Sequence, residues 1–372
     1  MEFSLHMSKV KNPPDYVFLI LVGILVLFGL IVLSSASSVF SYEKFGSSFY
    51  IVRHQILIGL LPGIFLFFFF LKMPYGIWRK FAFPLFALAL LILIFVLIPG
   101  IGQKFSGARS WFTIGSFSLQ PSEFAKLSLI IYLAAWCESR RQMLSDFKKG
   151  FLPFITIAAS LGLLIVLQPD VGTLFIVGAI VLFLAFVVGI RLPYLLGAVA
   201  CGALLLMLLI KVAPYRTARL TAFVHPELDP QGVGYHINQA LLAVGSGGFW
   251  GVGFGHSRQK FRYLPEVTGD SIFPIIAEEL GFIFSAALVL LIVAILWRMF
   301  RIARDAPDYF SKYAVAGIAG WFGIQSFVNI SSMLGVLPLT GLPLPFISYG
   351  GTALAASLSA AGLVGAISRH AK

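Results

Sequence analysis

The stretch YLPEVTGDSIFPIIAEELGF, residues 263–282, begins as a polar loop and continues into a long apolar segment. That segment extends to residue 297, which exceeds the roughly 20 residues that a helix needs to cross a bilayer. Four of the chain's 15 acidic residues lie in this short stretch, namely Glu266, Asp270, Glu278 and Glu279. A carboxylate within a span is costly and usually faces the bundle interior or a watery cavity. The stretch therefore predicts a membrane helix with a polar site near its N-terminal end.

The composition extends this prediction to a polytopic membrane protein. Of the 372 residues, 59% are hydrophobic and 11% are charged, and the mean hydropathy is +0.94. A soluble globular protein has about 25% charged residues, so this chain could not cover itself with polar groups in water. We expect one integral membrane domain over residues 1–372. Cys137 and Cys201 lie in or beside apolar segments and are expected to pack there rather than to form a disulfide.

Ten apolar segments have the length and character of membrane helices. The expected fold class is therefore an all-α polytopic membrane protein with about ten transmembrane helices. Short loops on one side carry more Lys and Arg, which places both tails, residues 1–15 and 368–372, in the cytoplasm. The segments are 16–36, 52–72, 81–98, 121–137, 152–169, 171–190, 194–212, 272–297, 313–334 and 347–367.

A large extracytoplasmic loop, residues 213–271, separates the seventh segment from the eighth and is expected to form an ordered cap. Its many aromatic and aliphatic residues disfavour disorder, and residues 234–244 have a helical pattern. Its cations suit the diphosphate of a lipid, and equally a basic loop that attracts anionic head groups. The glycine-dense run SGGFWGVGFG, residues 246–255, is compatible with an anion-binding nest or with a tight turn.

Asp270 directly precedes the eighth segment, and two roles are open for it. It can cap the helix, because Asp is a preferred N-cap residue and the helix dipole favours its ionised form. It can also act as a general base, which needs only to be ionised and within reach of the proton. Glu278 and Glu279 lie about 10–12 Å further along the axis and point about 100° apart, so we expect them not to share one partner.

Further polar groups are expected at the same outer end of the bundle. Lys126 follows Glu123 by one helical turn, and this spacing predicts an ion pair between them. Asp170 follows Gln168 and Pro169 and is expected to cap the next helix or to line a cavity. The agreement in location is stronger evidence for a site than any one of these motifs.

Two more outer segments carry candidate residues. Arg109 lies in the amphipathic outer loop 107–123 and is a candidate for a phosphate contact. Ser348 lies in TGLPLPFISYGG, residues 340–351, a segment interrupted by Pro and Gly. Irregular backbone at membrane depth is tolerated where it is buried or lines a cavity, so this segment is expected to border the site.

Several motifs occur together in one order along nearly the whole chain. They are GARSWFTIGSFSLQPSEFAKL, QPDVGT, PYRTARLTAF, GYHINQALLAVGSGGFWGVGFGHSRQKFRYLPE, D-x-IF followed by EELG, and GVLPLTGLPLPFISYGG. In this combination the chain resembles the SEDS family, the shape, elongation, division and sporulation proteins. Within that family, SRQKFRYLPE and LPLTGLPLPFISYGG are more similar to the FtsW division branch than to the RodA elongation branch.

The resemblance implies a peptidoglycan glycosyltransferase in the bacterial cytoplasmic membrane. Such an enzyme polymerises lipid II into glycan strands on the outer face, with inversion and release of undecaprenyl diphosphate. The family's essential acidic residue corresponds to Asp270, although this chain reads T-G-D-S-IF where relatives often read H-T-D-F-IF. The YLPE glutamate matches Glu266, and the EELG pair matches Glu278 and Glu279.

The resemblance implies roles for the candidate residues, and Asp270 is expected to be the general base. The candidate substrate ligands are Arg216, Arg219, Lys260, Arg258, Arg109 and Glu266. A divalent cation, Mg or Mn, could assist through Asp270 or Glu266, although no ligand spacing demands one.

The expected partners are lipid II, the growing lipid-linked glycan, a class B penicillin-binding protein and other divisome or elongasome membrane proteins, with no nucleic acid. The alternative function is a lipid II flippase or another membrane transporter, because intramembrane carboxylates and broken helices also mark transporters. Transporter sites lie near the midplane, whereas the polar groups of this chain gather toward one end.

Overall fold

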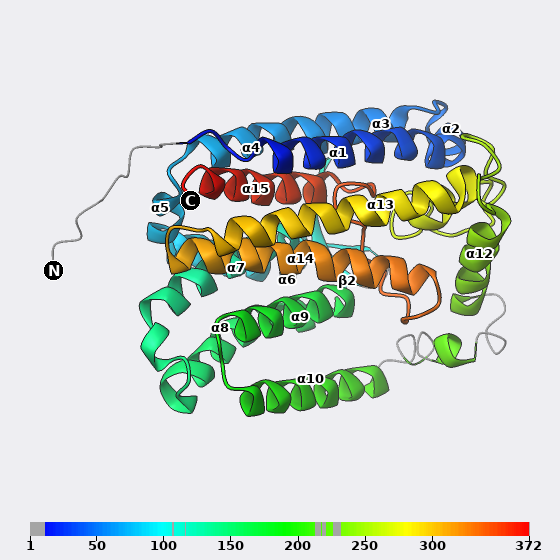
Figure 1. The fold of residues 1–372 in the computed structure, drawn as a ribbon. Helices are drawn as coiled ribbons and strands as arrows, with labels where there is room; N and C mark the ends of the chain where they lie inside the picture. Colours follow the sequence, from blue (N-terminus) through cyan, green and yellow to red (C-terminus); the bar gives the residue numbers. More distant parts are fainter. Residues whose placement is uncertain are drawn as a thin grey trace.

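The computed structural model describes residues 12–105, 108–115, 117–212, 217, 221–225 and 232–371, which form a bundle of long helices with one small sheet (Figure 1). The first helices are α1 (Tyr16–Ala36), α2 (Ser38–Phe45), α3 (Tyr50–His54), the π-helical turn η1 (Gln55–Leu60), α4 (Leu61–Lys72), α5 (Tyr75–Lys80) and α6 (Ala82–Leu97). The middle ones are α7 (Pro121–Ser139), the short turns η2 (Arg141–Met143) and η3 (Phe147–Phe151), α8 (Leu152–Leu167), α9 (Val171–Val187) and α10 (Leu192–Val212). The last are α12 (Val233–Ser246), α13 (Ile272–Arg304), α14 (Tyr309–Met333) and α15 (Gly351–Ser368).

Each of the ten expected segments coincides with a helix or a continuous helical run, which confirms the mainly helical polytopic fold class. Among the described residues, six such runs are long and apolar enough to cross a membrane: 16–36, 50–72, 147–167, 272–304, 309–333 and 351–368. Three shorter apolar helices cover 82–97, 171–187 and 192–208. The tenth is α7, which carries Glu123 and Lys126, and the number of crossings itself stays a prediction.

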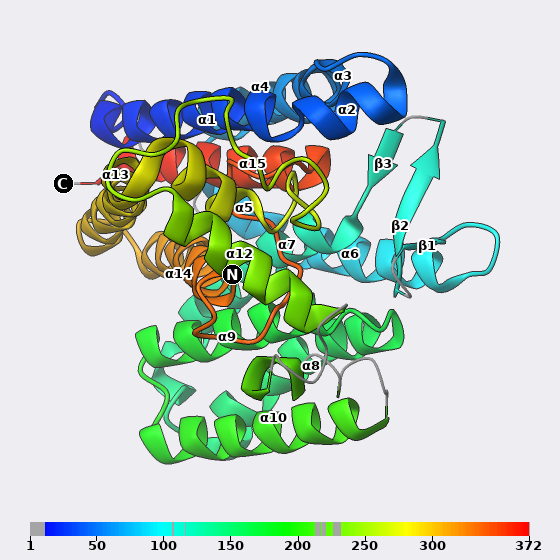
Figure 2. The same ribbon diagram turned by 90° about the vertical axis from the view of Figure 1, so that its right-hand side faces the viewer.

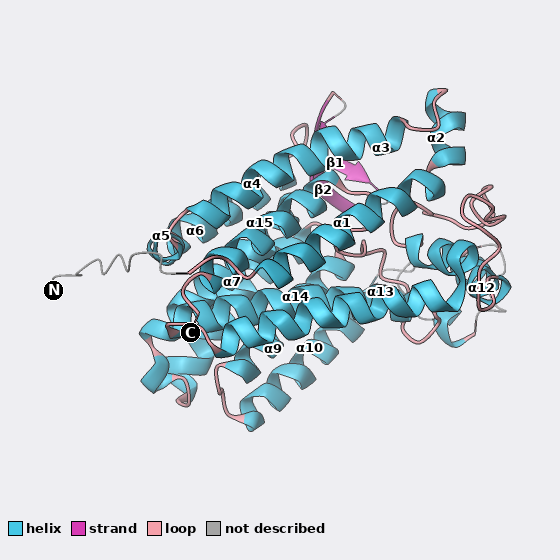
Figure 3. Cartoon of the chain, turned by 45° about the horizontal axis from the view of Figure 1, so that its top comes forward, coloured by secondary structure: helices cyan, strands magenta, loops and turns pink. Residues whose placement is uncertain are grey.

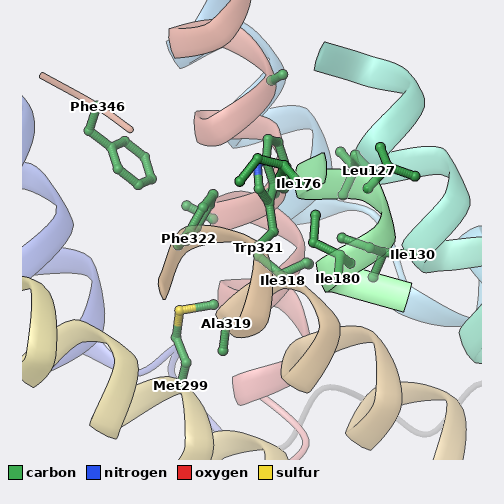
Figure 4. Packing of buried hydrophobic residues seen from close by; sticks show 14 of the residues in the cluster. Leu127, Ile130, Ile176, Ile180, Met299, Ile318, Ala319, Trp321, Phe322 and Phe346 are labelled. Atoms are coloured by element: carbon green, nitrogen blue, oxygen red, sulfur yellow. The ribbon is translucent and has the colours of Figure 1, made fainter. Parts of the chain in front are cut away.

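The helices α14 and α15 form the centre of the bundle. In Figure 1, α15 lies between the α1–α4 layer and the α13–α14 layer, and α10 lies at the edge beyond α9. Buried aliphatic and aromatic side chains from α7, α9, α13 and α14 meet around Trp321, with Phe346 of the broken segment nearby (Figure 4). Small residues permit this packing, because a methyl group added at Gly317 would lie 2.7 Å from Ile130 and one at Gly320 would lie 2.4 Å from Phe183.

One end of the bundle carries most of the irregular structure and is called the α12 end below. The loops before α13 gather there, and α12 crosses that end of the bundle (Figures 2 and 3). The expected helix at 234–244 is confirmed, since α12 spans Val233–Ser246. The start of α1 and the end of α15 lie together at the opposite end, where the Asp15 N–H donates to the Ser368 hydroxyl at 2.9 Å and Arg298 pairs with Asp15 at 2.7 Å (Figure 1).

The segment expected to be an amphipathic loop, 107–123, contains strands. An antiparallel sheet of order β1-β2-β3 is formed by β1 (Gln103–Phe105), β2 (Ala108–Ile114) and β3 (Phe117–Leu119). The sequence ARSWFTI of β2 is rich in aromatic and β-branched residues, which suit a strand. The two short flanking strands complete a sheet too small to leave a clear sequence pattern. The sheet is a small addition to a mainly helical fold.

The helix α13 is broken near its N-terminal end. Gly281 has φ 77° and ψ −173°, which no helix contains. In an unbroken helix the N–H groups of Phe282 and Ile283 would bond to the carbonyls of Glu278 and Glu279. The break frees these four backbone groups at a depth where each unsatisfied group is costly. It divides α13 into a short outer piece and a long apolar piece.

The glycine strap, residues 246–255, supplies the missing partners. Four bonds replace the helix ladder: Val252 N–H to Glu278 O (2.9 Å), Gly253 N–H to Glu279 O (3.0 Å), Phe282 N–H to Gly248 O (2.9 Å) and Ile283 N–H to Phe249 O (3.3 Å). Glycine is required for this approach, because a Cβ atom on Gly247 would lie 1.9 Å from the Ala277 carbonyl oxygen. Of the two alternatives for this run, the tight turn is observed, and the Val252 and Gly253 N–H groups bond to α13 rather than forming a nest.

Candidate active site

Asp270 lies at the α12 end, immediately before α13, and is only 8% exposed. The Asn329 side-chain amide on α14 donates to the Asp270 carbonyl at 2.9 Å and to the Leu342 carbonyl at 2.7 Å. The Tyr349 N–H donates to the Thr268 carbonyl at 2.8 Å. A spanning helix and the broken segment before α15 therefore both hold the backbone that carries Asp270.

The N-terminus of α13 does not use Asp270 as its cap residue. The helix begins at Ile272, and Ser271 occupies the N-cap position without a side-chain capping bond. The preceding turn is built on Glu266, whose φ is +49° and whose carbonyl accepts from Gly269 N–H at 2.9 Å and Ser271 N–H at 3.3 Å. The Glu266 side chain is exposed beside this turn. The general-base role for Asp270 remains as the prediction.

The two glutamates of α13 clamp the loop that follows the strap. Glu278 accepts from the Ser257 hydroxyl, from the Arg258 N–H at 2.9 Å and from the Gln259 N–H at 3.4 Å. Glu279 accepts from the Ser257 N–H at 3.3 Å. The two carboxylates therefore share Ser257, which corrects the expectation that they have no common partner. The hydroxyl and the N–H of one loop residue point in different directions, so they reach two helix residues that diverge.

Lys260 completes this clamp. Its ammonium group donates to Glu279 Oε1 at 3.0 Å, to the Ser35 hydroxyl at 3.1 Å and to the Gly255 carbonyl at 2.6 Å. Ser35 in turn donates to Glu279 at 2.7 Å, so the cluster joins α1, the loop and α13. An ammonium group has three donors, and Lys260, which is only 4% exposed, uses all three within the protein. The observed contacts of Lys260 are thus structural, and its binding of diphosphate stays a prediction.

The other predicted cations differ in their surroundings. Arg258 contributes only its backbone N–H to the clamp, and the residue is exposed. Arg109, on β2, donates through Nη1 to the Leu97 carbonyl at the end of α6, at 3.3 Å, and is half-buried. Arg216 and Arg219 lie outside the described residues. Of the described cations predicted to bind substrate, Arg258 is the one whose side chain is exposed.

The predicted ion pair on α7 is confirmed. Lys126 donates to Glu123 at 2.9 Å and to the Gln325 side chain on α14 at 2.9 Å, and its ammonium lies 4.8 Å from the centre of the Trp321 ring. Glu123 and Lys126 are 2% and 1% exposed, so this pair is an interior feature of the bundle. It links α7 to α14 just below the α12 end.

The remaining candidates have structural contacts. Asp170 caps α9, because its carboxylate accepts from the Thr173 N–H at 3.0 Å and the Thr173 hydroxyl at 2.8 Å. The Ser348 hydroxyl accepts from the Leu344 N–H at 2.8 Å and so shapes the broken segment. Of the two roles open for Asp170, capping is the one observed.

One contact of Asp270's neighbour was not foreseen from the sequence. His236 of α12 lies with its Nε2 atom 2.6 Å from the hydroxyl of Ser271. The two residues are 35 positions apart along the chain, and no spacing rule connects them. Among the described residues, no three His, Cys, Asp or Glu side chains are grouped closely enough to hold a metal ion.

Together, the fold and this site define a multi-pass membrane protein with a buried acid at one end of a helical bundle. The chain belongs to the SEDS family, because the family model of cell cycle proteins, which covers FtsW, RodA and SpoVE, matches residues 15–372. The chain is 39% identical to stage V sporulation protein E of Bacillus subtilis over 98% of its own length and 100% of that protein. It is 38% identical to the probable peptidoglycan glycosyltransferase FtsW of Trichlorobacter lovleyi, over 94% of the chain and 92% of that protein.

Solved structures agree with this assignment. A chain from a study of how a peptidoglycan synthase complex coordinates polymerization and crosslinking superposes with a TM-score of 0.80 at 30% identity, covering 96% of this chain and 98% of that one. The rod shape determining protein RodA of Thermus thermophilus superposes with a TM-score of 0.71 at 29% identity, covering 96% and 97%. The SEDS family predicted from the sequence is thus confirmed.

Proposed function

We propose that the chain is a peptidoglycan glycosyltransferase that polymerises lipid II on the outer face of the bacterial cytoplasmic membrane. One observation carries the proposal: a buried Asp270, held by two elements of the bundle at the α12 end. The names of the FtsW relatives support the reaction class. The α12 end then faces outward, and both termini lie in the cytoplasm.

The proposed reaction joins the 4-hydroxyl of one sugar to the anomeric carbon of another. The new bond forms between that oxygen and the anomeric carbon, and the bond from the same carbon to the diphosphate oxygen breaks. The donor linkage is α and the product linkage is β, so one inverting displacement suffices, with a base on the acceptor as in inverting glycosidases. Asp270 takes the hydroxyl proton, and undecaprenyl diphosphate leaves.

Cationic side chains stabilise the negative charge that develops on the departing diphosphate. Such preorganised charge is often the largest single contribution to catalysis. Arg258 is the described candidate, and Arg109 is a weaker one because its guanidinium already bonds to Leu97. Arg216 and Arg219 remain candidates on the sequence alone. Glu266, which is exposed four residues before Asp270, is a further candidate ligand of lipid II.

A divalent cation, Mg or Mn, is a further candidate: Asp270 or Glu266 would hold it, and it would supply positive charge toward the departing diphosphate. Among the described residues, no three His, Cys, Asp or Glu side chains are grouped closely enough to hold a metal ion, so the protein itself would supply few of its ligands. The protein's own contributions are a general base, Asp270, and cationic side chains that stabilise the developing charge.

Partners follow from the same proposal. The likeness to a chain from a peptidoglycan synthase complex supports a class B penicillin-binding protein as the crosslinking partner. Relatives named FtsW and stage V sporulation protein E support a role in division or in sporulation, alongside other membrane proteins of the division machinery.

A lipid II flippase is the second candidate, and the interior ion pair favours it. Glu123 and Lys126 are almost fully buried within the bundle, as the ionisable groups of transporters are. Flipping would need access to these groups from both sides of the membrane.

The test is polymerisation of labelled lipid II by the purified protein, with and without its transpeptidase, beside the variant Asp270→Asn. Asn keeps the size of the side chain but cannot take a proton, so we expect glycan ladders from the natural protein and none from the variant. Ladders from both would assign the base elsewhere. Absence of ladders from either, in a folded complex with the partner, would favour the flippase, which vesicle translocation of lipid II then measures.

A further inference from the structure

Three side chains form a connected line across the N-termini of α12 and α13. His236 Nε2 lies 2.6 Å from Ser271 Oγ, and Ser271 Oγ lies 3.5 Å from Asp270 Oδ1. The first contact is short, and the second is longer than the roughly 2.5–3.0 Å of an ordinary O–H···O hydrogen bond. The line runs from the half-buried imidazole, through a fully buried hydroxyl, to the buried carboxylate.

The direction of the hydrogen bonds along this line depends on the tautomer of His236. A serine hydroxyl carries a single proton, and an ionised carboxylate can only accept. When the Ser271 proton points at Asp270, the contact with His236 requires the imidazole Nε2–H as the donor. With the opposite tautomer, the histidine would draw the Ser271 proton away from Asp270. The tautomer of His236 thus determines whether the Ser271 hydroxyl proton points toward Asp270.

We propose that His236 is a positioning residue that acts on Asp270 through Ser271. His236 donates to Ser271 and turns its hydroxyl proton toward Oδ1 of Asp270, which fixes the orientation of the carboxylate. This inference rests on the proposed glycosyl transfer with Asp270 as its base. A base displaced by about 1 Å loses about 100-fold in rate, so a modest loss of orientation has a measurable cost.

The position of His236 gives the contact a second use. His236 lies in the first turn of α12, and Ser271 is the N-cap residue of α13. The hydrogen bond therefore joins the large outer loop to the spanning helix at the residue beside the base. Any displacement of α12 would be transmitted to Asp270 through one contact.

The test compares His236→Leu with His236→Gln, and Ser271→Ala with Ser271→Thr, in the purified full chain with its transpeptidase and labelled lipid II. Leu and Ala remove the two polar groups, whereas the Gln amide can still donate and Thr keeps a hydroxyl. We expect kcat to fall about 10- to 100-fold in the Leu and Ala variants with KM for lipid II nearly unchanged, and to recover in the Gln and Thr variants. His256→Leu is the matched control, since His256 is exposed and bonds only locally, to the Phe254 carbonyl at 3.1 Å.

The double variant His236→Leu/Ser271→Ala separates positioning from general damage. Two residues that act through one contact give a double loss no larger than either single loss, whereas independent effects add. Additive losses, or losses that follow a lowered unfolding temperature, would overturn the inference. If the natural protein is active and His236→Leu is fully active too, only the inference about His236 is overturned. If the natural protein is inactive, the proposed function is overturned together with that inference.

Discussion

Lys260 and Arg262 are two cations of one loop, and their ion pairs contribute differently to stability because their surroundings differ. Lys260 pairs with Glu279 at 3.0 Å, and the two side chains are 3% and 2% exposed. Arg262 pairs with Glu43 at 2.6 Å, but its side chain is 72% exposed. Breaking a buried pair strands the other charge in a medium of low polarity, whereas an exposed pair exchanges protein contacts for water.

Lys260→Met should lower the free energy of unfolding by about 3–5 kcal/mol, because it leaves Glu279 buried without its cation. Thermal unfolding in detergent measures this loss. Arg262→Met is the matched control in the same loop and should leave the unfolding temperature nearly unchanged. Equal shifts in the two variants would mean that the Lys260 pair contributes no more than a surface contact.

Residue contacts were predictable from the sequence where they are local. The Glu123–Lys126 pair follows from helical spacing, and the structure confirms it. The clamp on Glu278 and Glu279 could not be predicted, because its partners arrive from a loop that folds back on the helix. The sequence alone therefore predicts that Lys260 binds substrate, whereas its three donors bond within the protein.

Among the elements, the broken helix α13 and the glycine strap form a single unit. The strap completes the hydrogen bonds that α13 loses at Gly281, so neither piece is fully bonded without the other. The strap also leads directly into the clamp and then to Asp270. The geometry of the proposed base therefore depends on the backbone hydrogen bonds between the strap and residues 278–283 of α13.

Gly247→Ala should disturb this unit, because the added methyl group would lie 1.9 Å from the Ala277 carbonyl. We expect at least a tenfold loss of polymerisation, with a lowered unfolding temperature, since the strap must move off α13. Gly245→Ala, two residues earlier in α12, meets nothing within 4 Å and is the control. Alanine there should be neutral or stabilise by about 0.5–1 kcal/mol. A harmless Gly247→Ala would show that the strap does not pack as described.

Sequence periodicity predicted the elements unevenly. The long apolar runs predicted every long helix, including the start of α13 near Ser271. The strands were not predicted because β1 and β3 have only three residues each, and because the sequence containing β2 was interpreted as an amphipathic loop. The glycine run predicted a special backbone, but the choice between nest and turn depends on the partner backbone at residues 278–283, which the run itself does not reveal.

At the scale of the whole molecule, the two ends of the bundle differ in character. One end joins the start of α1, the end of α13 and the end of α15 through Asp15, Arg298 and Ser368. There the Tyr75 hydroxyl donates to Asp308 at 3.0 Å, and burial, with the negative charge of Asp308, raises the pKa of Tyr75 to about 12. The other end holds the strap, the clamp and Asp270. High hydropathy does not mark the centre of the bundle, because the buried helices α14 and α15 are less apolar than the more exposed α1.

Reporter fusions test the proposed orientation of these ends. Green fluorescent protein at either terminus should fluoresce, and alkaline phosphatase at the same positions should be inactive, because both termini are proposed to be cytoplasmic. Alkaline phosphatase fused at Gly100, an exposed turn residue with φ 91°, should be active and is the internal control. Active phosphatase at the C-terminus would reverse the orientation or change the parity of the spans.

The strap also gives the protein a native optical probe. Trp250 is 78% exposed on the strap, and its neighbour Phe249 meets Phe282 of α13 edge-to-face at 5.9 Å, beside the point where the long apolar piece of α13 begins. An indole at that level lies where a bilayer passes from head groups to acyl chains. In nanodiscs made with brominated lipids, its fluorescence should be quenched, and Trp250→Phe should remove that quenched fraction. The same signal would report any lifting of the strap while a glycan chain grows.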